Sequence, residues 1–142
     1  MASAESCTGG LVGHVITQVP RSSDHFLGGV VSYSNAVKEE LLDVPAELIE
    51  RVGAVSAEVA EAMTTGALAR FPAARLAVAV TGIAGPDGGS EDKPVGLTYV
   101  AAAIRDGRAA VERHTWPHDR DGNKRASALA ALELAARVAD EA

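Results

Sequence analysis

The most informative stretch of this sequence is residues 76–90, which read Leu76-Ala77-Val78-Ala79-Val80-Thr81-Gly82-Ile83-Ala84-Gly85-Pro86-Asp87-Gly88-Gly89-Ser90. It opens with a continuous apolar run, which is typical of a central strand covered on both faces. Four glycines then fall within nine residues, and glycines let the backbone approach a ligand closely. Ligands of open α/β sheets bind beyond the carboxyl ends of the strands. We therefore expect a buried strand that leads into a small-molecule site, with a ligand-free surface loop as the alternative.

Helical and strand patterns alternate on both sides of this stretch. Upstream, we expect a helix over residues 11–19, a strand over 30–33, a helix over 35–42, a short helix between Pro45 and Gly53, and a helix over 56–71. Downstream, we expect strands over 96–104 and 109–116 joined by the Asp106-Gly107 turn, and an alanine-rich helix over 122–141 with Leu129, Leu132 and Ala136 on its inner face. The pattern predicts a single α/β domain over residues 1–142, a three-layer α/β/α sandwich with a mixed sheet.

Composition excludes several classes of protein. The formal net charge is −6, which argues against nucleic acid as a partner because phosphate backbones require a basic face. The single cysteine allows no disulfide within the chain and fits a reducing compartment. No apolar run is long enough for a membrane span and no signal peptide is recognisable, so we expect a cytoplasmic protein. The histidines lack metal-ligand spacing, and we expect neither a metal nor another cofactor.

A second glycine-rich turn lies near the start of the chain, at Glu5-Ser6-Cys7-Thr8-Gly9-Gly10. It runs directly into the helical pattern of residues 11–19. The amino end of a helix carries free N–H groups and partial positive charge, where anions bind well. Two turns of this kind in one α/β domain favour a small-molecule site over a binding surface for macromolecules.

Serine and lysine are the side chains with the most useful chemistry here. Ser6 lies in the first turn, and no histidine is convincingly placed to activate it. Lys38 follows the junction between the strand over 30–33 and the next helix, where a partly desolvated amine titrates low enough to accept a proton. Ser23, on another turn before a strand, is a rival nucleophile. The alternative is that these serines are helix caps and that Lys38 is a solvated helix residue.

Cationic and thiol side chains complete the set of candidates. Arg120 lies beside the start of the last helix, and its planar fork suits a phosphate, although a solvent-exposed cap explains its position equally well. Lys93 precedes the strand over 96–104 and would add a charge to the same site. Cys7 is better explained as a small buried filler than as a nucleophile.

A series of sequence blocks covers essentially the whole chain in order. The blocks are Ala4-Glu5-Ser6-Cys7-Thr8-Gly9-Gly10, Phe26-Leu27-Gly28-Gly29-Val30-Val31-Ser32-Tyr33-Ser34-Asn35 with Lys38, Gly53-Ala54-Val55-Ser56, Thr81-Gly82-Ile83-Ala84-Gly85-Pro86-Asp87-Gly88-Gly89 and Lys93-Pro94-Val95-Gly96. Together they closely resemble the CinA carboxy-terminal domain family. The resemblance implies a nicotinamide-nucleotide amidohydrolase, which converts nicotinamide mononucleotide and water to nicotinic acid mononucleotide and ammonia in pyridine nucleotide recycling.

The resemblance also implies which residues form the site. It implies serine–lysine chemistry with Lys38 as the base and Ser6 or Ser23 as the nucleophile, of which we favour Ser6. Tyr33 matches a further family position that we place in the catalytic set. The residues that we expect to bind the substrate are Thr8, Gly9, Asn35, Thr81, Gly82, Gly85, Gly88, Gly89 and Arg120. The expected partner is a small pyridine nucleotide, with no metal, nucleic acid or membrane.

The chain departs from the family pattern at its start. Family members carry roughly a helix and a strand before the Glu5–Gly10 block, whereas only Met1-Ala2-Ser3-Ala4 precede it here. We therefore expect a domain that lacks the family's first helix and strand, with a short sheet or an exposed sheet edge. A homodimer would help to cover such a sheet.

Two other functions compete with the amidohydrolase. One is a non-catalytic nucleotide-binding accessory domain linked to competence or to the DNA-damage response, and the other is a structural oligomerisation domain. Substituting Lys38 by alanine separates them, because an enzyme loses turnover, a binding domain keeps its ligand and an oligomerisation domain has no ligand to keep.

Overall fold

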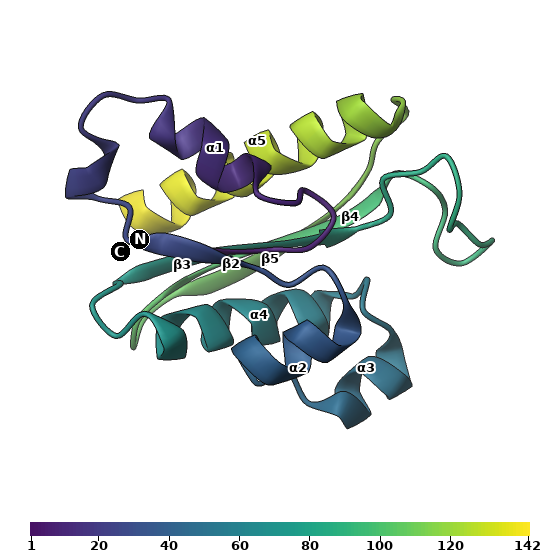
Figure 1. Cartoon of the computed structure of the whole chain (residues 1–142), viewed down its shortest axis with the longest axis horizontal. Helices are drawn as coiled ribbons and strands as arrows, with labels where there is room; N and C mark the ends of the chain where they lie inside the picture. The colour runs from purple at the N-terminus through teal and green to yellow at the C-terminus, as the bar shows by residue number, and fades with distance from the viewer.

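A five-stranded mixed sheet forms the centre of the computed structural model, which describes residues 1–142 (Figure 1). The strands are β1 (Ala2–Glu5), β2 (Gly28–Val31), β3 (Leu76–Gly82), β4 (Leu97–Ile104) and β5 (Ala109–Thr115), in the spatial order β2-β1-β3-β4-β5. β1 pairs in parallel with β2 and β3, whereas β4 pairs antiparallel with β3 and β5. The mixed sheet expected from the sequence is confirmed.

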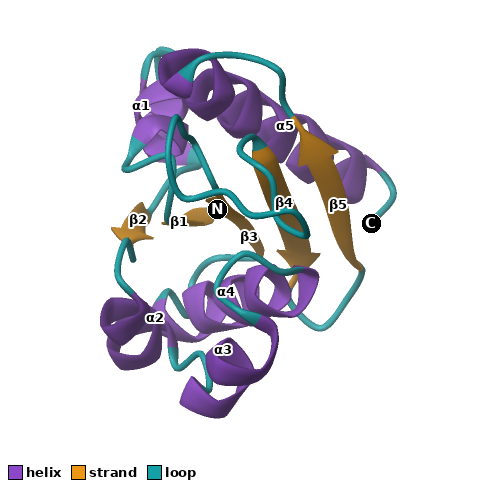
Figure 2. Cartoon of the chain, turned by 90° about the vertical axis from the view of Figure 1, so that its right-hand side faces the viewer, coloured by secondary structure: helices purple, strands orange, loops and turns teal.

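Helices cover both faces of this sheet. They are α1 (Leu11–Thr17), α2 (Asn35–Leu42), α3 (Ala46–Val52), α4 (Ala57–Arg70) and α5 (Arg120–Asp140), with a 3-10 turn η1 (Ser22–Asp24) after α1. Helices α1 and α5 lie on one face, and α2, α3 and α4 lie on the other (Figures 1 and 2). The chain is therefore a three-layer α/β/α sandwich, and none of its helices is both long enough and apolar enough to cross a lipid bilayer.

β3 explains why the sheet is covered on both faces. Its side chains alternate, so Val78 and Val80 pack in the cluster under α5, while Ala77 and Ala79 pack in the cluster under α4. All four are fully buried. The strand predicted from the apolar run over residues 76–80 is confirmed, and alanine on the second face leaves room for α4 to lie close to the sheet.

The inner face of α5 differs from the expected one. Leu129 is 53% exposed, Ala136 is exposed and Leu132 is only partly buried. The buried side chains of this helix are Asn123, Ser127, Ala128, Ala130, Ala131, Leu134, Ala135 and Val138. The prediction was wrong because the inner face follows the small alanines, which let the helix approach the valines of the sheet, rather than the largest apolar residues.

The few residues before Ser6 form a strand inside the sheet. We expected them to leave the sheet short or an edge exposed at this point. Instead, Ala2 to Glu5 pair with β2 on one side and β3 on the other, and all four residues of β1 are buried. The Glu5–Gly10 turn is therefore anchored by a strand on its amino side.

Helices α2 and α4 approach each other closely at Gly66. A Cβ atom placed on this buried glycine would overlap the carbonyl group of Leu42, the last residue of α2. A glycine-to-alanine change inside a helix usually adds up to about 1 kcal/mol of stability. Because the overlap here is with backbone, we expect Gly66→Ala to lower the free energy of unfolding by about 2 kcal/mol. Urea denaturation measures it, with the exposed neighbour Thr65→Ala as control, and a stability equal to that of the control would contradict the close approach.

Candidate active site

Parallel pairing brings Ser6 and Lys38 together. Ser6 directly follows β1, and Lys38 lies in α2, which begins shortly after β2. The helix start is set by Ser34, whose Oγ accepts a hydrogen bond from the N–H of Val37. Since the carboxyl ends of neighbouring parallel strands meet at one edge of a sheet, the two side chains converge there, with Lys38 Nζ 2.9 Å from Ser6 Oγ.

The Lys38 amine is buried and has no acidic partner. Its side chain is 1% exposed, and its other contacts are the backbone carbonyl oxygens of Ser32 at 2.8 Å and Tyr33 at 3.2 Å. Burial lowers the pKa of Lys38 below its ordinary value, which favours the neutral amine. The alternative that Lys38 is a solvated helix residue is wrong.

Hydrogen-bond counting shows what the neutral amine can do. It has two N–H donors, which the carbonyls of Ser32 and Tyr33 accept, and one lone pair. The remaining neighbour is the Ser6 hydroxyl, which can donate its proton to that lone pair. With a neutral amine, this arrangement can place a proton acceptor beside the Ser6 hydroxyl.

Cys7 lies next to Ser6, but its thiol is unreactive. Its side chain is buried in the core cluster under α5. Burial raises the pKa of Cys7 to about 12, so the thiol stays protonated near neutral pH and is a poor nucleophile. This supports the interpretation of Cys7 as a buried filler.

A cavity of about 250 Å³ opens at this edge of the sheet. Its walls come from the segments after β1 and β2, the end of β3, the starts of α2 and α5, and the connection between α3 and α4. The residues expected at the site that line it are Ser6, Tyr33, Asn35, Lys38, Thr81, Gly82 and Arg120. Both turns singled out in the sequence therefore contribute to one cavity.

Arg120 is the other basic side chain that lines the cavity. Its Nη1 donates to the carbonyl oxygen of Gly85 at 2.6 Å, and its Nη2 donates to the Tyr33 hydroxyl at 3.3 Å. No carboxylate forms an ion pair with Arg120. Its charge is therefore free to bind an anion. Thr81, by contrast, uses its hydroxyl to donate to the carbonyl oxygen of Ala54 at 2.9 Å.

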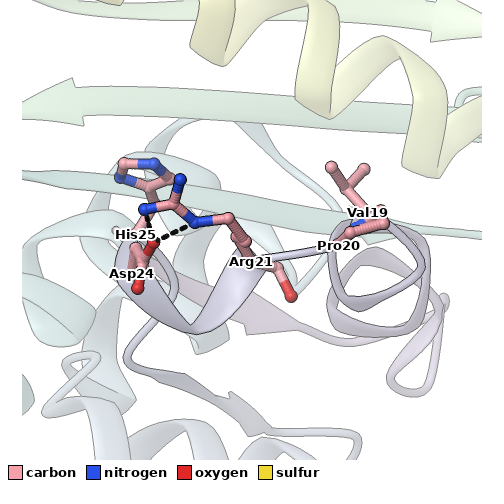
Figure 3. Close-up of a pocket in the computed structure, with 6 residues that line it drawn as sticks. Val19, Pro20, Arg21, Asp24 and His25 are labelled. Carbon is pink, nitrogen blue, oxygen red and sulfur yellow. Dashed lines mark hydrogen bonds and ion pairs between the residues drawn. The ribbon is translucent and has the colours of Figure 1, made fainter.

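The structure does not bring Ser23 and Lys38 together. Ser23 is exposed in η1, before the amino end of β2, whereas Lys38 follows the carboxyl end of the same strand. The cavity near η1 is a different one of about 580 Å³, lined by Val19, Pro20, Arg21, Ser22, Asp24 and His25 (Figure 3). There Arg21 and Asp24 form an ion pair at 2.8 Å with each other.

Several residues expected to bind substrate lie outside the cavity lining. The Thr8 hydroxyl is buried and donates to the Glu5 carboxylate at 2.7 Å. Gly9 is exposed, and so are Gly88 and Gly89 in the outer part of the loop between β3 and β4. Gly85 contributes through its carbonyl oxygen, which holds Arg120.

The amino end of α1 is already occupied by the chain itself. The Glu5 carboxylate accepts hydrogen bonds from the N–H groups of Gly10 at 3.2 Å, Val12 at 2.8 Å and Gly13 at 3.1 Å. The expectation that this helix end binds a ligand anion is therefore wrong. The Glu5 carboxylate binds the N–H groups that we expected a ligand anion to bind.

Sequence reasoning missed the apolar walls and one polar support of the site. Ala54, Val55 and Ala84 line the cavity, but small apolar residues carry no chemical signature. Asn123 is 2% exposed, donates to the Ala84 carbonyl at 2.9 Å and accepts from the His118 N–H at 3.0 Å. Its signal in the sequence was a polar residue on the buried side of an alanine-rich helix.

Comparison with known proteins gives close relatives along the sequence. The family model of the CinA C-terminal domain matches residues 1–139. A CinA-like protein of Geotalea uraniireducens is 53% identical over 121 residues, which is 85% of this chain and 28% of the relative. A CinA-like protein of Mycobacterium marinum is 48% identical over 141 residues, which is 99% of this chain and 33% of the relative. The chain thus spans about a third of the length of these curated relatives.

Solved structures show the same fold. The crystal structure of the competence/damage-inducible protein CihA from Agrobacterium tumefaciens has a TM-score of 0.92 and 40% identity, covering 96% of this chain and 83% of that one. A competence-damaged protein (CinA) superfamily protein from Escherichia coli has a TM-score of 0.88 and 30% identity, covering 94% and 76%. Because the family model matches residues 1–139, almost the whole chain, this chain belongs to the CinA C-terminal domain family.

Proposed function

We propose that this domain hydrolyses the carboxamide of nicotinamide mononucleotide to give nicotinic acid mononucleotide and ammonia. The observation that carries the proposal is the 2.9 Å contact between Ser6 Oγ and the amine of Lys38, which is buried and has no acidic partner. Family membership supports the choice of substrate, because the CinA resemblance implies a nicotinamide-nucleotide amidohydrolase. Hydrolysis of an amide requires a nucleophile and a base, and this pair supplies both.

Acylation starts with the neutral form of Lys38. The amine takes the Ser6 proton while the serine oxygen attacks the carboxamide carbon, giving a tetrahedral intermediate with a negative oxygen. The backbone N–H group of Cys7 makes no backbone hydrogen bond, and Cys7 lines the cavity. It is adjacent to the nucleophile and is our candidate for stabilising that oxygen.

The same amine completes the reaction. Protonated Lys38 passes its proton to the leaving nitrogen as the C–N bond breaks, which releases ammonia and leaves an ester on Ser6. In the second half, Lys38 takes a proton from water as the water oxygen bonds to the ester carbon, and it returns that proton to Ser6 Oγ as the ester C–O bond breaks. While Lys38 is protonated within each half, the carbonyls of Ser32 and Tyr33 accept hydrogen bonds from its ammonium group.

Binding energy remote from the amide would come from Arg120. Arg120 lines the same cavity as Ser6 and forms no ion pair, so we assign its guanidinium to the phosphate of a nucleotide whose carboxamide lies at Ser6. A planar fork binds phosphate strongly, and such binding orients the amide for attack.

Removing the Arg120 guanidinium should weaken binding of the substrate phosphate. We expect Arg120→Gln to raise KM for nicotinamide mononucleotide by about 10- to 100-fold, as for loss of a charge-assisted hydrogen bond. The same substitution should change kcat/KM for nicotinamide riboside, which lacks the phosphate, by about threefold or less. Steady-state kinetics on both substrates give the comparison, and an equal loss on both would exclude Arg120 as the phosphate ligand.

The direct test of the proposed function is ammonia release from nicotinamide mononucleotide by the purified 142-residue chain. Turnover that tracks enzyme concentration and yields nicotinic acid mononucleotide in equal amounts supports the amidohydrolase. Binding of the nucleotide by a folded chain without turnover would favour the accessory binding domain instead. Absence of both would leave the oligomerisation domain.

A further inference from the structure

Glu5 and Lys38 are the only acidic or basic side chains that the fold buries, at 2% and 1% exposed. They do not form an ion pair with each other. Burying a charge is costly unless it is well hydrogen-bonded, so each must have a local compensation. Burial lowers the pKa of Lys38, and its amine lies within hydrogen-bond distance of oxygen atoms of Ser6, Ser32 and Tyr33. Glu5 is compensated by hydrogen-bond donors instead.

The Glu5 carboxylate is held by four donors on the segment that follows it. Its Oε1 accepts from the Thr8 hydroxyl at 2.7 Å, the Gly10 N–H at 3.2 Å and the Val12 N–H at 2.8 Å, and its Oε2 accepts from the Gly13 N–H at 3.1 Å. These N–H groups belong to the amino end of α1, whose partial positive charge favours an anion. The side chain thereby ties the 6–10 turn to the helix behind it.

The backbone of Glu5 is connected to the other half of the site. Its carbonyl oxygen accepts from the N–H of Ser32 at 2.7 Å and from the Ser32 hydroxyl at 3.3 Å. The carbonyl oxygen of Ser32 in turn accepts from Lys38 Nζ. Glu5 therefore directly precedes the nucleophile Ser6 in the chain. Across the sheet, hydrogen bonds through Ser32 connect its backbone to the base Lys38.

We propose that Glu5 is a positioning residue of the serine–lysine centre, which holds the turn so that Ser6 faces Lys38 and the N–H group of Cys7 stays free. The inference rests on the proposed amidase function for its kinetic consequence, but not for its structural one. Because Glu5 occupies the positive end of α1, that helix end is not open to the phosphate of a nucleotide substrate, which agrees with the phosphate site proposed at Arg120.

The test uses Glu5→Gln, which keeps the size of the side chain but points amide N–H groups at N–H donors. Cys7 is the only cysteine and is buried in the turn, so its reaction with a thiol reagent under native conditions reports opening of this segment. We expect labelling to accelerate by about tenfold or more, kcat for nicotinamide mononucleotide to fall about 100-fold, and KM to stay within about threefold.

A matched control separates positioning from general loss of stability. Val138→Ala removes buried apolar atoms in the last turns of α5, at the end of that helix far from Arg120, and should lower Tm by loss of packing alone. Compared at temperatures equally far below each Tm, only Glu5→Gln should label fast and lose kcat. Should Glu5→Gln fail to fold, Thr8→Val removes one donor from the carboxylate and should give smaller changes in the same direction.

The outcomes distinguish this inference from the proposed function. Labelling no faster than in Val138→Ala would overturn it whether or not the wild-type chain is an amidase. Fast labelling with an unchanged kcat would reduce Glu5 to a structural role and overturn the positioning claim. A wild-type chain without amidase activity contradicts the proposed function alone, and the labelling comparison still decides whether Glu5 holds the turn.

Discussion

Lys38→Met is expected to abolish hydrolysis of nicotinamide mononucleotide while leaving the fold intact. The thioether fills a similar volume but has no lone pair basic enough to take the Ser6 proton, so kcat should fall by at least about 1,000-fold. The side chain is 1% exposed, and methionine is tolerated in such a place far better than a charge. Ammonia release and thermal unfolding of the same preparation give both results.

The titration of Lys38 gives this prediction a pH dependence. The active form is the neutral amine, so kcat/KM should rise with pH through the pKa of Lys38, which burial places below its ordinary value of 10.5. Stability should change in the same sense. Between the lowered native pKa and the ordinary unfolded one, the unfolded chain holds one proton more, so the free energy of unfolding increases with pH across that window. Lys38→Met should lack this increase and have a higher Tm near neutral pH.

Lys38→Arg is the matched control for charge. Arginine keeps a cation at the site but does not lose its proton, so it cannot act as a base. We expect it to be as inactive as Lys38→Met. Retention of more than about a tenth of the wild-type kcat in either variant would show that Lys38 is not the base.

Ser6→Ala should eliminate turnover, whereas Ser23→Ala should not. Loss of a nucleophile typically lowers kcat by 1,000-fold or more, and we expect a loss of about that size for Ser6→Ala. Ser23 is exposed in η1 and makes no contact with Lys38, so its loss should change kcat by about twofold or less. Single-turnover kinetics of both variants provide the measurement.

Binding of the substrate to Ser6→Ala completes the assignment. The hydroxyl supplies little of the affinity compared with Arg120 and the cavity walls, so Kd for nicotinamide mononucleotide should stay within about fivefold of the wild type. Calorimetric titration of the inactive variant measures it directly. Turnover lost in Ser23→Ala and kept in Ser6→Ala would instead require a rearrangement that brings η1 to the far end of β2.

Local signals in the sequence were sufficient for most of the fold. The apolar run over residues 76–80, the cap at Ser56 and the stop at Gly53 each appear where expected, because caps, glycines and apolar runs act within a few residues. The inner face of α5 was not predictable in the same way. Alanines and leucines alternate around that helix, and which of them is buried depends on how closely the valines of the sheet allow it to approach.

The candidate site was predictable as a set of residues but not as an arrangement. Ser6, Lys38, Thr81 and Arg120 were identified from chemistry and family resemblance, and all line the one cavity. The choice between Ser6 and Ser23 depended on which end of the parallel strands each serine occupies. Ser6 follows the carboxyl end of β1, whereas Ser23 precedes the amino end of β2. The role of Glu5 was hidden, because a carboxylate beside a turn does not reveal which N–H groups it will meet.

By itself, therefore, the sequence determined the order of the elements, the family and the kinds of side chain available for chemistry. Only the tertiary structure decided that Ser6 meets Lys38 across 32 positions of sequence, that this lysine lacks an acidic partner, and that Glu5 rather than a ligand fills the end of α1. The physical reason is the distance along the chain over which each kind of interaction acts. Helix caps, turns and apolar runs act between neighbours in the chain, whereas burial and hydrogen bonding between distant segments exist only once the sheet has paired.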